Sequence, residues 1–348
     1  MTVDTTAAVT ASKPPLRRLG RSGLSVSTLG FGGAPLGDLY AVLDEAQAVA
    51  TVEAALDGGV TLVDTSPLYG HGLSEHRIGA ALRRRPGRPV LLSTKVGRVA
   101  RPFAGRGDGS GYVGGLPHGL AFDYSHDGVL RSLEQSALRL GVDRIDIVLI
   151  HDVDVRTHGA EAVEGRFREA MDGAYRALER LRSAGAVAAI GVGVNEAAMC
   201  ERFARAGDFD TMLLAGRYSL LEQPALASFL PLALEKGIGL MLGGVFNSGI
   251  LATGPVPGAR YDYRPAPPEI LARVAAIAAV CDRHGVTLRR AALQFPLGHP
   301  AVASLVMGAV TPAEVADQLA ALADPVPAAL WAELKAEGLL GADVPVPA

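Results

Sequence analysis

Short apolar runs of strand length alternate with segments of helical periodicity along almost the whole chain. The strand-like runs are residues 27–33, 60–63, 89–96, 145–150, 187–194, 211–214, 238–242 and 303–307. The helical segments are residues 44–56, 74–84, 127–140, 167–183, 196–206, 224–235, 268–284, 288–297 and 312–322. This alternation predicts a parallel sheet whose strands are joined by right-handed helical crossovers.

The chain reads as one domain. No break in composition divides it, and its 348 residues suit one α/β barrel with insertions. We therefore expect a single (β/α)8 TIM barrel over residues 16–340, with extra helices towards the C-terminal end. Residues 1–15 lack the charge and apolar core of a signal peptide and are expected to be a disordered lead-in. Residues 341–348 are expected to be a C-terminal tail.

Two further segments stand out at the barrel's edges. Residues 16–19 and 24–26 flank a Gly20–Gly23 turn and predict a β-hairpin that closes the barrel bottom. Residues 98–124 are rich in Gly, Pro and Arg and have no periodicity. Such a stretch predicts a long irregular loop, which in a compact domain is usually functional or disordered.

Composition excludes several classes of function. The formal net charge is -3, with acidic residues outnumbering basic ones, so nucleic-acid binding is not expected. No uncharged apolar run approaches the ~18 residues of a membrane span. Cys200 and Cys281 lack CxxC spacing and predict free thiols in a reducing cytosol. We expect a cytoplasmic protein that is a monomer or a weak homo-oligomer.

Common cofactor and nucleophile motifs are missing or misplaced. A GxGxxG pattern at Gly109–Gly114 neither follows a strand nor opens a helix, so it is interpreted as a loop feature. There is no Walker A, HExxH or GxSxG sequence. The histidines are scattered, and no metal site is expected.

Polar residues able to carry protons follow three of the strand-like runs. Asp64, Lys95 and His151 stand at strand ends, and Tyr69 lies just past Asp64. Strand ends of a parallel barrel converge on one face, where chemistry occurs. Asp64 and Lys95 could form a purely structural ion pair. Alternatively, Tyr69 is a proton donor or acceptor whose pKa Lys95 lowers, with Asp64 orienting Lys95 and His151 binding the reacting oxygen.

From about residue 16 to residue 340 the chain resembles the aldo-keto reductases. The resemblance is carried, in order, by Asp64-Thr-Ser-Pro-Leu-Tyr69-Gly, Ser93-Thr-Lys95, Leu149-Ile-His151-Asp152 and Ile190-Gly-Val-Gly-Val-Asn195. It implies an eight-stranded α/β barrel, a catalytic set of Asp64, Tyr69, Lys95 and His151, and an extended nicotinamide dinucleotide across the barrel mouth.

The same resemblance implies cofactor contacts. The implied positions are Asn195, Tyr218, Gly244, Phe246, Ser248, Gly249, Leu251, Met307, Gly308, Glu314 and Gln318. Asn195 matches the residue that binds the nicotinamide carboxamide, and the glycine-rich segment 243–251 matches a pyrophosphate loop. The aromatic residue that usually stacks on the nicotinamide falls at Gly243 or Gly244, which leaves Phe246 or Tyr218 as substitutes.

Cofactor preference is inferred from the segment that follows the last strand-like run. The positions that carry cations in NADP-preferring relatives hold Gly308, Val310 and Glu314 here. A carboxylate repels a 2′-phosphate, so NAD is expected over NADP. The alternative is that Arg289 or Arg290 reaches across and supplies the cation.

The substrate is predicted only by class. The resemblance is to a branch that oxidises cyclic hemiacetals to lactones, including L-fucose or D-threo-aldose 1-dehydrogenases, L-galactose dehydrogenases and pyridoxal 4-dehydrogenase. We therefore expect an NAD-linked oxidation of an aldose such as L-fucose, D-arabinose or L-galactose. The alternatives are oxidation of pyridoxal and, in another class, a cofactor-retaining binding or regulatory subunit. Candidate substrate contacts are Phe31, Tyr40, Tyr112, Phe122, Tyr124, Asp152 and the segment around Trp331.

Overall fold

Eight parallel strands close into a barrel in the computed structural model, which describes residues 13–105 and 111–348. In barrel order the strands are β3 (Leu29–Gly32), β4 (Leu62–Asp64), β5 (Leu91–Val96), β8 (Ile147–His151), β9 (Ala189–Val194), β10 (Thr211–Ala215), β11 (Gly239–Gly243) and β14 (Val302–Gly308). β14 pairs with β3 to complete the closure. The predicted barrel is confirmed, and each strand overlaps its predicted run to within one residue at the carboxyl end. Residues 1–12 of the expected lead-in lie outside the described residues, as do the first two positions of the GxGxxG pattern.

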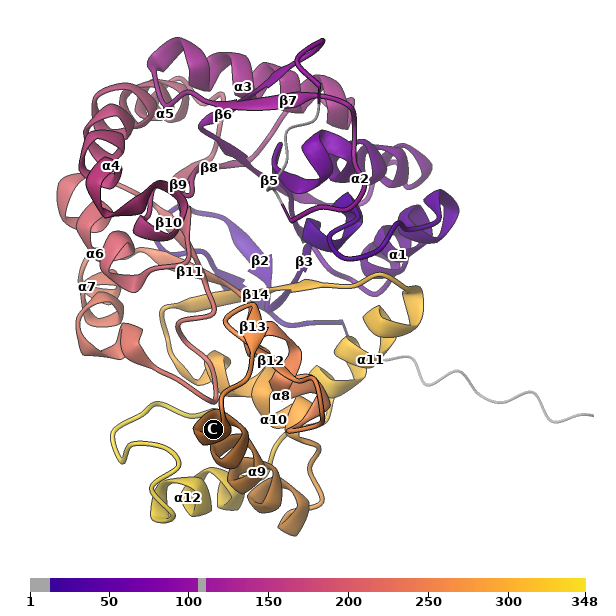
Figure 1. Ribbon diagram of the computed structural model, residues 1–348, viewed down its shortest axis with the longest axis vertical. Helices are drawn as coiled ribbons and strands as arrows, with labels where there is room; N and C mark the ends of the chain where they lie inside the picture. Colours follow the sequence, from indigo (N-terminus) through magenta and orange to yellow (C-terminus); the bar gives the residue numbers. More distant parts are fainter. Residues whose placement is uncertain (1–12, 106–110) are drawn as a thin grey trace, which may run out of the picture.

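Helices surround the strands on all sides (Figure 1). They are α1 (Glu45–Asp57), α2 (Leu73–Arg84), α3 (His126–Leu140), α4 (Val155–Glu169), α5 (Arg176–Ser183), α6 (Ala197–Ala206), α7 (Phe229–Glu235), α8 (Ile250–Thr253), α9 (Pro268–Arg283), α10 (Leu288–Gln294), α11 (Pro312–Ala323) and α12 (Ala328–Ala336). α9 and α12 pack on each other outside the ring (Figure 1). No helix in the described part of the chain is long and apolar enough to span a membrane.

Two local predictions were wrong. The helix expected from residue 167 starts earlier. Asp154 accepts a hydrogen bond from the Thr157 amide and caps a first turn at Val155, the non-helical backbone of Gly159 (φ 76, ψ 159) breaks the helix, and α4 then continues to Glu169. Only Val163 is buried in α4, so that segment has no apolar stripe for a periodicity argument to detect. The expected irregular loop at 98–124 contains an antiparallel pair, β6 (Arg98–Arg101) with β7 (Gly119–Phe122).

The predicted N-terminal hairpin is confirmed and closes the amino end of the barrel. β1 (Leu16–Arg18) pairs antiparallel with β2 (Ser25–Ser27). Leu19 and Val26 are fully buried and join the apolar cluster inside the barrel. Gly20 has φ +53, and a Cβ there would lie 2.3 Å from the Gly239 amide nitrogen, so the turn approaches β11 at a distance that only glycine permits.

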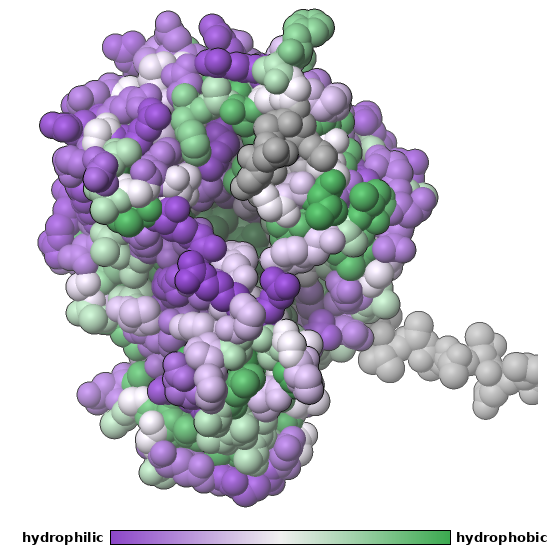
Figure 2. All heavy atoms as spheres, in the orientation of Figure 1, coloured by the Kyte–Doolittle hydropathy of each residue, from purple (hydrophilic) through white to green (hydrophobic). Residues whose placement is uncertain are grey.

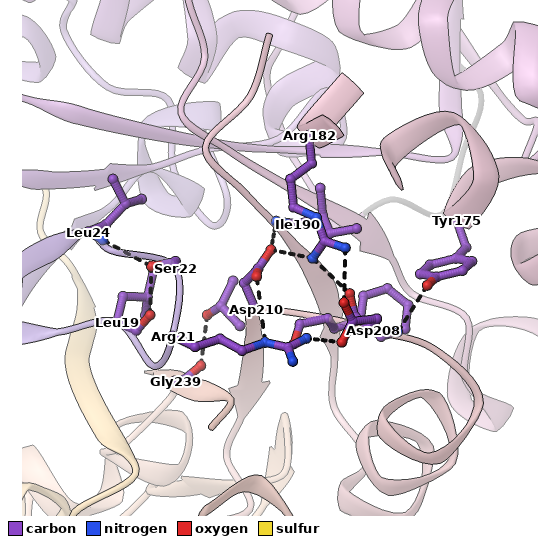
Figure 3. A network of polar contacts seen from close by, with 12 residues as sticks. Leu19, Arg21, Ser22, Leu24, Tyr175, Arg182, Ile190, Asp208, Asp210 and Gly239 are labelled. Atoms are coloured by element: carbon purple, nitrogen blue, oxygen red, sulfur yellow. Dashed lines mark hydrogen bonds and ion pairs between the residues drawn. The ribbon is translucent and has the colours of Figure 1, made fainter. Parts of the chain in front are cut away.

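A polar network ties this hairpin to the strands behind it (Figure 3). Asp210 is at the centre, since its carboxylate accepts hydrogen bonds from the Ile190 amide and from Arg182, both at 2.9 Å. Arg21, in the hairpin turn, forms an ion pair with Asp208 and lies 3.9 Å from Asp210. The amide of Ile190, the second residue of β9, is thereby satisfied by the side chain of the residue that precedes β10.

We expect Asp210→Ala to lower the free energy of unfolding by about 2 kcal/mol, because it leaves the buried Ile190 amide without an acceptor. The matched control is Asp208→Ala, whose carboxylate is 60% exposed and whose loss should cost less than about 1 kcal/mol. Urea denaturation followed by circular dichroism measures both. Equal losses for the two variants would contradict this role for Asp210.

Candidate active site

The carboxyl ends of the strands surround a cavity of about 910 Å³. Figure 2 shows this face hollowed near its centre, with hydrophilic side chains around the opening. All four predicted catalytic residues, Asp64, Tyr69, Lys95 and His151, line the cavity. They come from β4, the turn after β4, β5 and β8, and the closure of the barrel brings them together.

Asp64 and Lys95 form a buried ion pair beneath the cavity. The Lys95 Nζ lies 2.6 Å from Asp64 Oδ2, and the two side chains are 1% and 2% exposed. Lys95 also donates to the Thr65 carbonyl at 2.8 Å, and Ser93 Oγ donates to Asp64 Oδ1 at 2.7 Å. These bonds satisfy both charges, as a buried pair requires. The ammonium also lies 4.7 Å from the centroid of the Tyr69 ring, so the pair faces the phenol.

Tyr69 is held in place by a close approach of two glycines. Gly70 has φ +60, and a Cβ there would lie 2.5 Å from the Gly37 carbonyl oxygen. The prediction that Lys95 lowers the pKa of Tyr69 is wrong for the protein alone. Desolvation, followed by the negative charges of Asp64 and Asp152, raises the pKa of Tyr69 well above its usual value. Asp64 largely neutralises Lys95, so burial decides the direction and the phenol stays protonated.

His151 is also neutral in this site. Its Nδ1 lies 3.1 Å from Ser66 Oγ and 3.1 Å from Arg98 Nη1. Burial, with the positive charges of Arg98 and Lys95, holds the pKa of His151 well below 6.5. A neutral imidazole can donate a hydrogen bond to a reacting oxygen but does not carry a charge to it.

Arg98 is a buried cavity residue that was not predicted from the sequence. It opens β6 inside the stretch interpreted as an irregular loop, yet it is 7% exposed and lines the cavity. Its Nη2 donates to Asp152 Oδ2 at 2.8 Å. The available signal was its place two residues after Val96, at the end of a buried strand.

The candidate substrate residues divide into two groups. Tyr40, Tyr112, Phe122 and Asp152 line the cavity, whereas Phe31, Tyr124 and Trp331 do not. Those three are at most 2% exposed and belong to the apolar core between strands and helices. Tyr124 instead donates its hydroxyl to the His151 carbonyl at 2.7 Å and so supports the site from behind.

A narrower slot of about 250 Å³ adjoins the cavity. Seven of the predicted cofactor residues line it: Asn195, Gly244, Phe246, Ser248, Gly249, Met307 and Gly308. The slot is also lined by Asn247 of the predicted 243–251 loop and by residues that were not predicted, among them Arg217, Glu222, Asp262 and Tyr263. Asn195, Gly244, Tyr263 and Gly308 line both spaces, so the slot and the cavity are continuous.

Four predicted cofactor contacts are placed elsewhere. Tyr218 is 1% exposed with its ring 5.5 Å from that of Phe295, and Leu251 is fully buried. Glu314 accepts a hydrogen bond from the Val310 amide, and Gln318 donates to the Gly308 carbonyl, so both shape the loop beside the slot. Tyr218 therefore offers no stacking face, which leaves Phe246 and the unpredicted Tyr263 among the slot's aromatic residues.

The slot suits a nicotinamide dinucleotide. A Cβ at Gly216 or Gly249 would meet nothing within 4 Å, and both glycines have positive φ, so their backbone faces open space. The buried Asn247 Oδ1 has no hydrogen-bond partner in the protein. Backbone amides of such glycine-rich turns bind phosphate oxygens at close range. The carboxamide of Asn195 at the junction is suited to binding a matching amide.

The two arginines considered for cofactor preference are placed differently. Arg290 forms an ion pair with Asp324. Arg289 lies 3.6 Å from Asp317, and its guanidinium is 6.0 Å from the centroid of Phe246, which lines the slot. Of these two arginines, only Arg289 is near enough to the slot to reach a cofactor bound there, and its guanidinium already faces the Asp317 carboxylate.

Comparisons with known proteins agree with this geometry. The model of the Aldo/keto reductase family matches residues 28–337. Pyridoxal 4-dehydrogenase of Microbacterium luteolum is 42% identical, over 93% of this chain and 97% of its own. D-threo-aldose 1-dehydrogenase of a Pseudomonas species is 40% identical, over 90% and 94%. The structure of an aldo-keto reductase from Bacillus halodurans in its holo form superposes with a TM-score of 0.72 at 25% identity, covering 94% of this chain and 97% of its own.

We expect Asp64→Asn to destabilise the protein by about 3–5 kcal/mol, because it leaves the Lys95 ammonium buried and unpaired. Adding Lys95→Met should restore part of that loss, since no buried charge then remains. Guanidinium denaturation of the two single variants and the double variant measures the coupling. A control at the exposed Arg88–Asp57 pair, Arg88→Met, should change stability by less than about 1 kcal/mol. Additive losses at Asp64 and Lys95 would refute the coupling.

Proposed function

The chain belongs to the aldo/keto reductase family, and on that premise we propose that it is an NAD-dependent dehydrogenase that oxidises a cyclic hemiacetal to its lactone. The observation that carries the proposal is the placement of Tyr69, Lys95, Asp64 and His151 around one cavity that opens onto the glycine-lined slot. The names of two relatives, a pyridoxal dehydrogenase and an aldose 1-dehydrogenase, support oxidation as the direction.

The reaction requires two transfers from the substrate. A bound nicotinamide dinucleotide supplies the acceptor for the hydride that leaves the hemiacetal carbon. The hydroxyl proton of the same carbon passes to the phenolate of Tyr69. His151 donates a hydrogen bond to the oxygen that becomes the lactone carbonyl. Asn195 and the glycines at 216, 244 and 249 would hold the dinucleotide.

Aldoses are the first substrate class that we propose. The cavity presents Asp152, Arg156 and Thr157 along its wall, and these side chains can bind several hydroxyl groups. Their number suits a polyhydroxylated ring, which buries many polar groups when it binds.

Pyridoxal is the second candidate, and its support comes from the aromatic residues of the same cavity. Tyr40, Tyr69, Tyr112, Phe122 and Tyr263 all line it, and the Tyr69 and Tyr112 rings have centroids 6.1 Å apart. Flat rings of this kind suit a planar aromatic substrate. The hemiacetal form of pyridoxal would undergo the same oxidation to a lactone.

The appearance of NADH absorbance tests these candidates in one assay. The panel contains L-fucose, D-arabinose, L-galactose and pyridoxal, with the lactone product identified by mass spectrometry. Turnover of either class supports hemiacetal oxidation and names the substrate class. No turnover of any sugar, hemiacetal or aldehyde in a broad panel would reject the proposal and favour a binding or regulatory subunit.

Oxidation should become faster as the pH rises, because only ionised Tyr69 can accept the proton and its pKa is raised. Below that pKa the active fraction grows about tenfold per pH unit, so log kcat/KM should rise with a slope near 1 between about pH 7 and 9.

Tyr69→Phe should lower kcat by at least ~10² with little change in the dissociation constant for NAD. Tyr112→Phe, at the neighbouring ring, is the control and should retain most activity. A flat pH profile or an active Tyr69→Phe variant would remove Tyr69 from this role.

We expect NAD to be used in preference to NADP, because Arg289, the nearer of the two arginines considered, lies 3.6 Å from the Asp317 carboxylate. Asp317→Asn should free Arg289 and raise the NADP-to-NAD ratio of kcat/KM by about fivefold, the effect of one exposed charge pair. Asp324→Asn, which frees Arg290 instead, is the matched control and should leave the ratio unchanged. A wild-type KM for NADP below that for NAD would overturn the preference.

A further inference from the structure

Arg98 is a buried arginine that binds two cavity residues with one guanidinium group. Its Nη1 lies 3.1 Å from His151 Nδ1, and its Nη2 donates to Asp152 Oδ2 at 2.8 Å. The central carbon of the guanidinium, Cζ, lies over the Phe122 ring, 4.5 Å from the ring centroid. The Arg98 carbonyl accepts a hydrogen bond from Ser132 in α3 at 2.8 Å, which fixes the start of β6.

The backbone before Arg98 shows why this side chain turns back over the barrel. Gly97 has φ +105, and a Cβ there would lie 2.3 Å from the Tyr124 ring. Only glycine permits that conformation against that ring. The chain therefore leaves β5 at Val96 and places Arg98 within reach of the end of β8.

The contact with Arg98 determines which nitrogen of His151 carries the proton. A guanidinium group has donors and no acceptor, so Nδ1 must be the accepting, unprotonated nitrogen. The hydroxyl of Ser66, also 3.1 Å from Nδ1, can donate to the same atom. In a neutral imidazole the proton is then on Nε2, which lies 3.4 Å from Asp152 Oδ1.

Without Arg98, the charges around His151 would favour its protonated, imidazolium form. The titratable and charged groups that face it from the surrounding elements are Asp64, Tyr69, Lys95, Arg98, Tyr124 and Asp152. Asp64 and Lys95 neutralise each other. Without Arg98, the carboxylate of Asp152 would be unpaired beside Nε2, an arrangement that stabilises an imidazolium.

We propose that Arg98 is a positioning residue that holds His151 as a neutral donor with its proton on Nε2 and keeps Asp152 from charging it. For catalysis this inference rests on the proposed function, because His151 must donate to the substrate oxygen. As a statement about the protonation of His151 in the free protein, the inference does not depend on the proposed function. A guanidinium that merely neutralised Asp152 would need no contact with Nδ1.

NMR of protein with 15N-labelled histidine tests the free protein without any substrate. In the wild type, His151 should show the neutral form protonated on Nε2 across the stable pH range. A form protonated on Nδ1, or an imidazolium at neutral pH, would overturn the proposal outright. This measurement stands even if the protein oxidises none of the proposed substrates, so the two proposals fail separately.

Three variants separate the effects of Arg98. Arg98→Met removes both donor and charge, and His151 should then titrate between about pH 5 and 8. Arg98→Gln keeps an amide donor without the charge, so titration should appear there too while the neutral tautomer is retained. Arg101→Met, at the exposed end of the same strand, is the control and should behave as the wild type. An unchanged His151 spectrum in a folded Arg98→Met or Arg98→Gln protein would refute the proposal.

Kinetics test whether Arg98 acts through His151. Arg98→Met should lower kcat about 10- to 100-fold, the usual effect of losing a residue that orients a functional group, with a smaller change in KM. In a His151→Gln background the same change should cost less than about twofold, because the group it positions is gone. Equal losses in the two backgrounds would show that Arg98 acts independently of His151.

Discussion

The buried pair of Asp64 and Lys95 is the interaction on which the site depends. Two charges almost fully removed from water are tolerated only because each makes further hydrogen bonds, from Ser93 to the carboxylate and from the ammonium to the Thr65 carbonyl. β4 and β5 are neighbours in register, with Asp64 opposite Ser93, so the barrel itself supplies this arrangement. The pair places a positive charge against the Tyr69 ring but leaves little net charge there. With little net charge to oppose it, burial raises the pKa of Tyr69, and the phenol remains protonated in the free protein.

The two ends of the barrel differ in what their side chains do. At the amino end, the hairpin inserts Leu19 and Val26 into the interior, and the Asp210 carboxylate accepts hydrogen bonds from the Ile190 amide and from Arg182. This end therefore contributes to stability. At the carboxyl end the interior holds charged side chains and an open cavity, which is the usual division of roles in such barrels.

Sequence reasoning succeeded where the signal was local. Asp64, Lys95 and His151 lay at the ends of buried strands, with Tyr69 just past one of them, and parallel closure was enough to predict that the ends would meet. It failed where the signal was tertiary. Arg98 lies in a four-residue strand, Arg98–Arg101, which is too short to show an apolar pattern. Within the described residues this strand pairs with β7 and not with the barrel. Tyr218 and Tyr124 resemble site residues in the sequence but pack inward against Phe295 and His158. The protonation of Tyr69 depends on desolvation, which no sequence pattern reports.

The sequence by itself determined the barrel, the set of Asp64, Tyr69, Lys95 and His151, and the family, because periodicity and strand-end chemistry are properties of short segments. Only the tertiary structure decided which aromatic residues face the cavity and that Arg289 faces Asp317. It also decided that one guanidinium bridges His151 and Asp152. These features depend on side chains from distant segments meeting in a medium of low dielectric, where burial and a single neighbouring charge determine the protonation state.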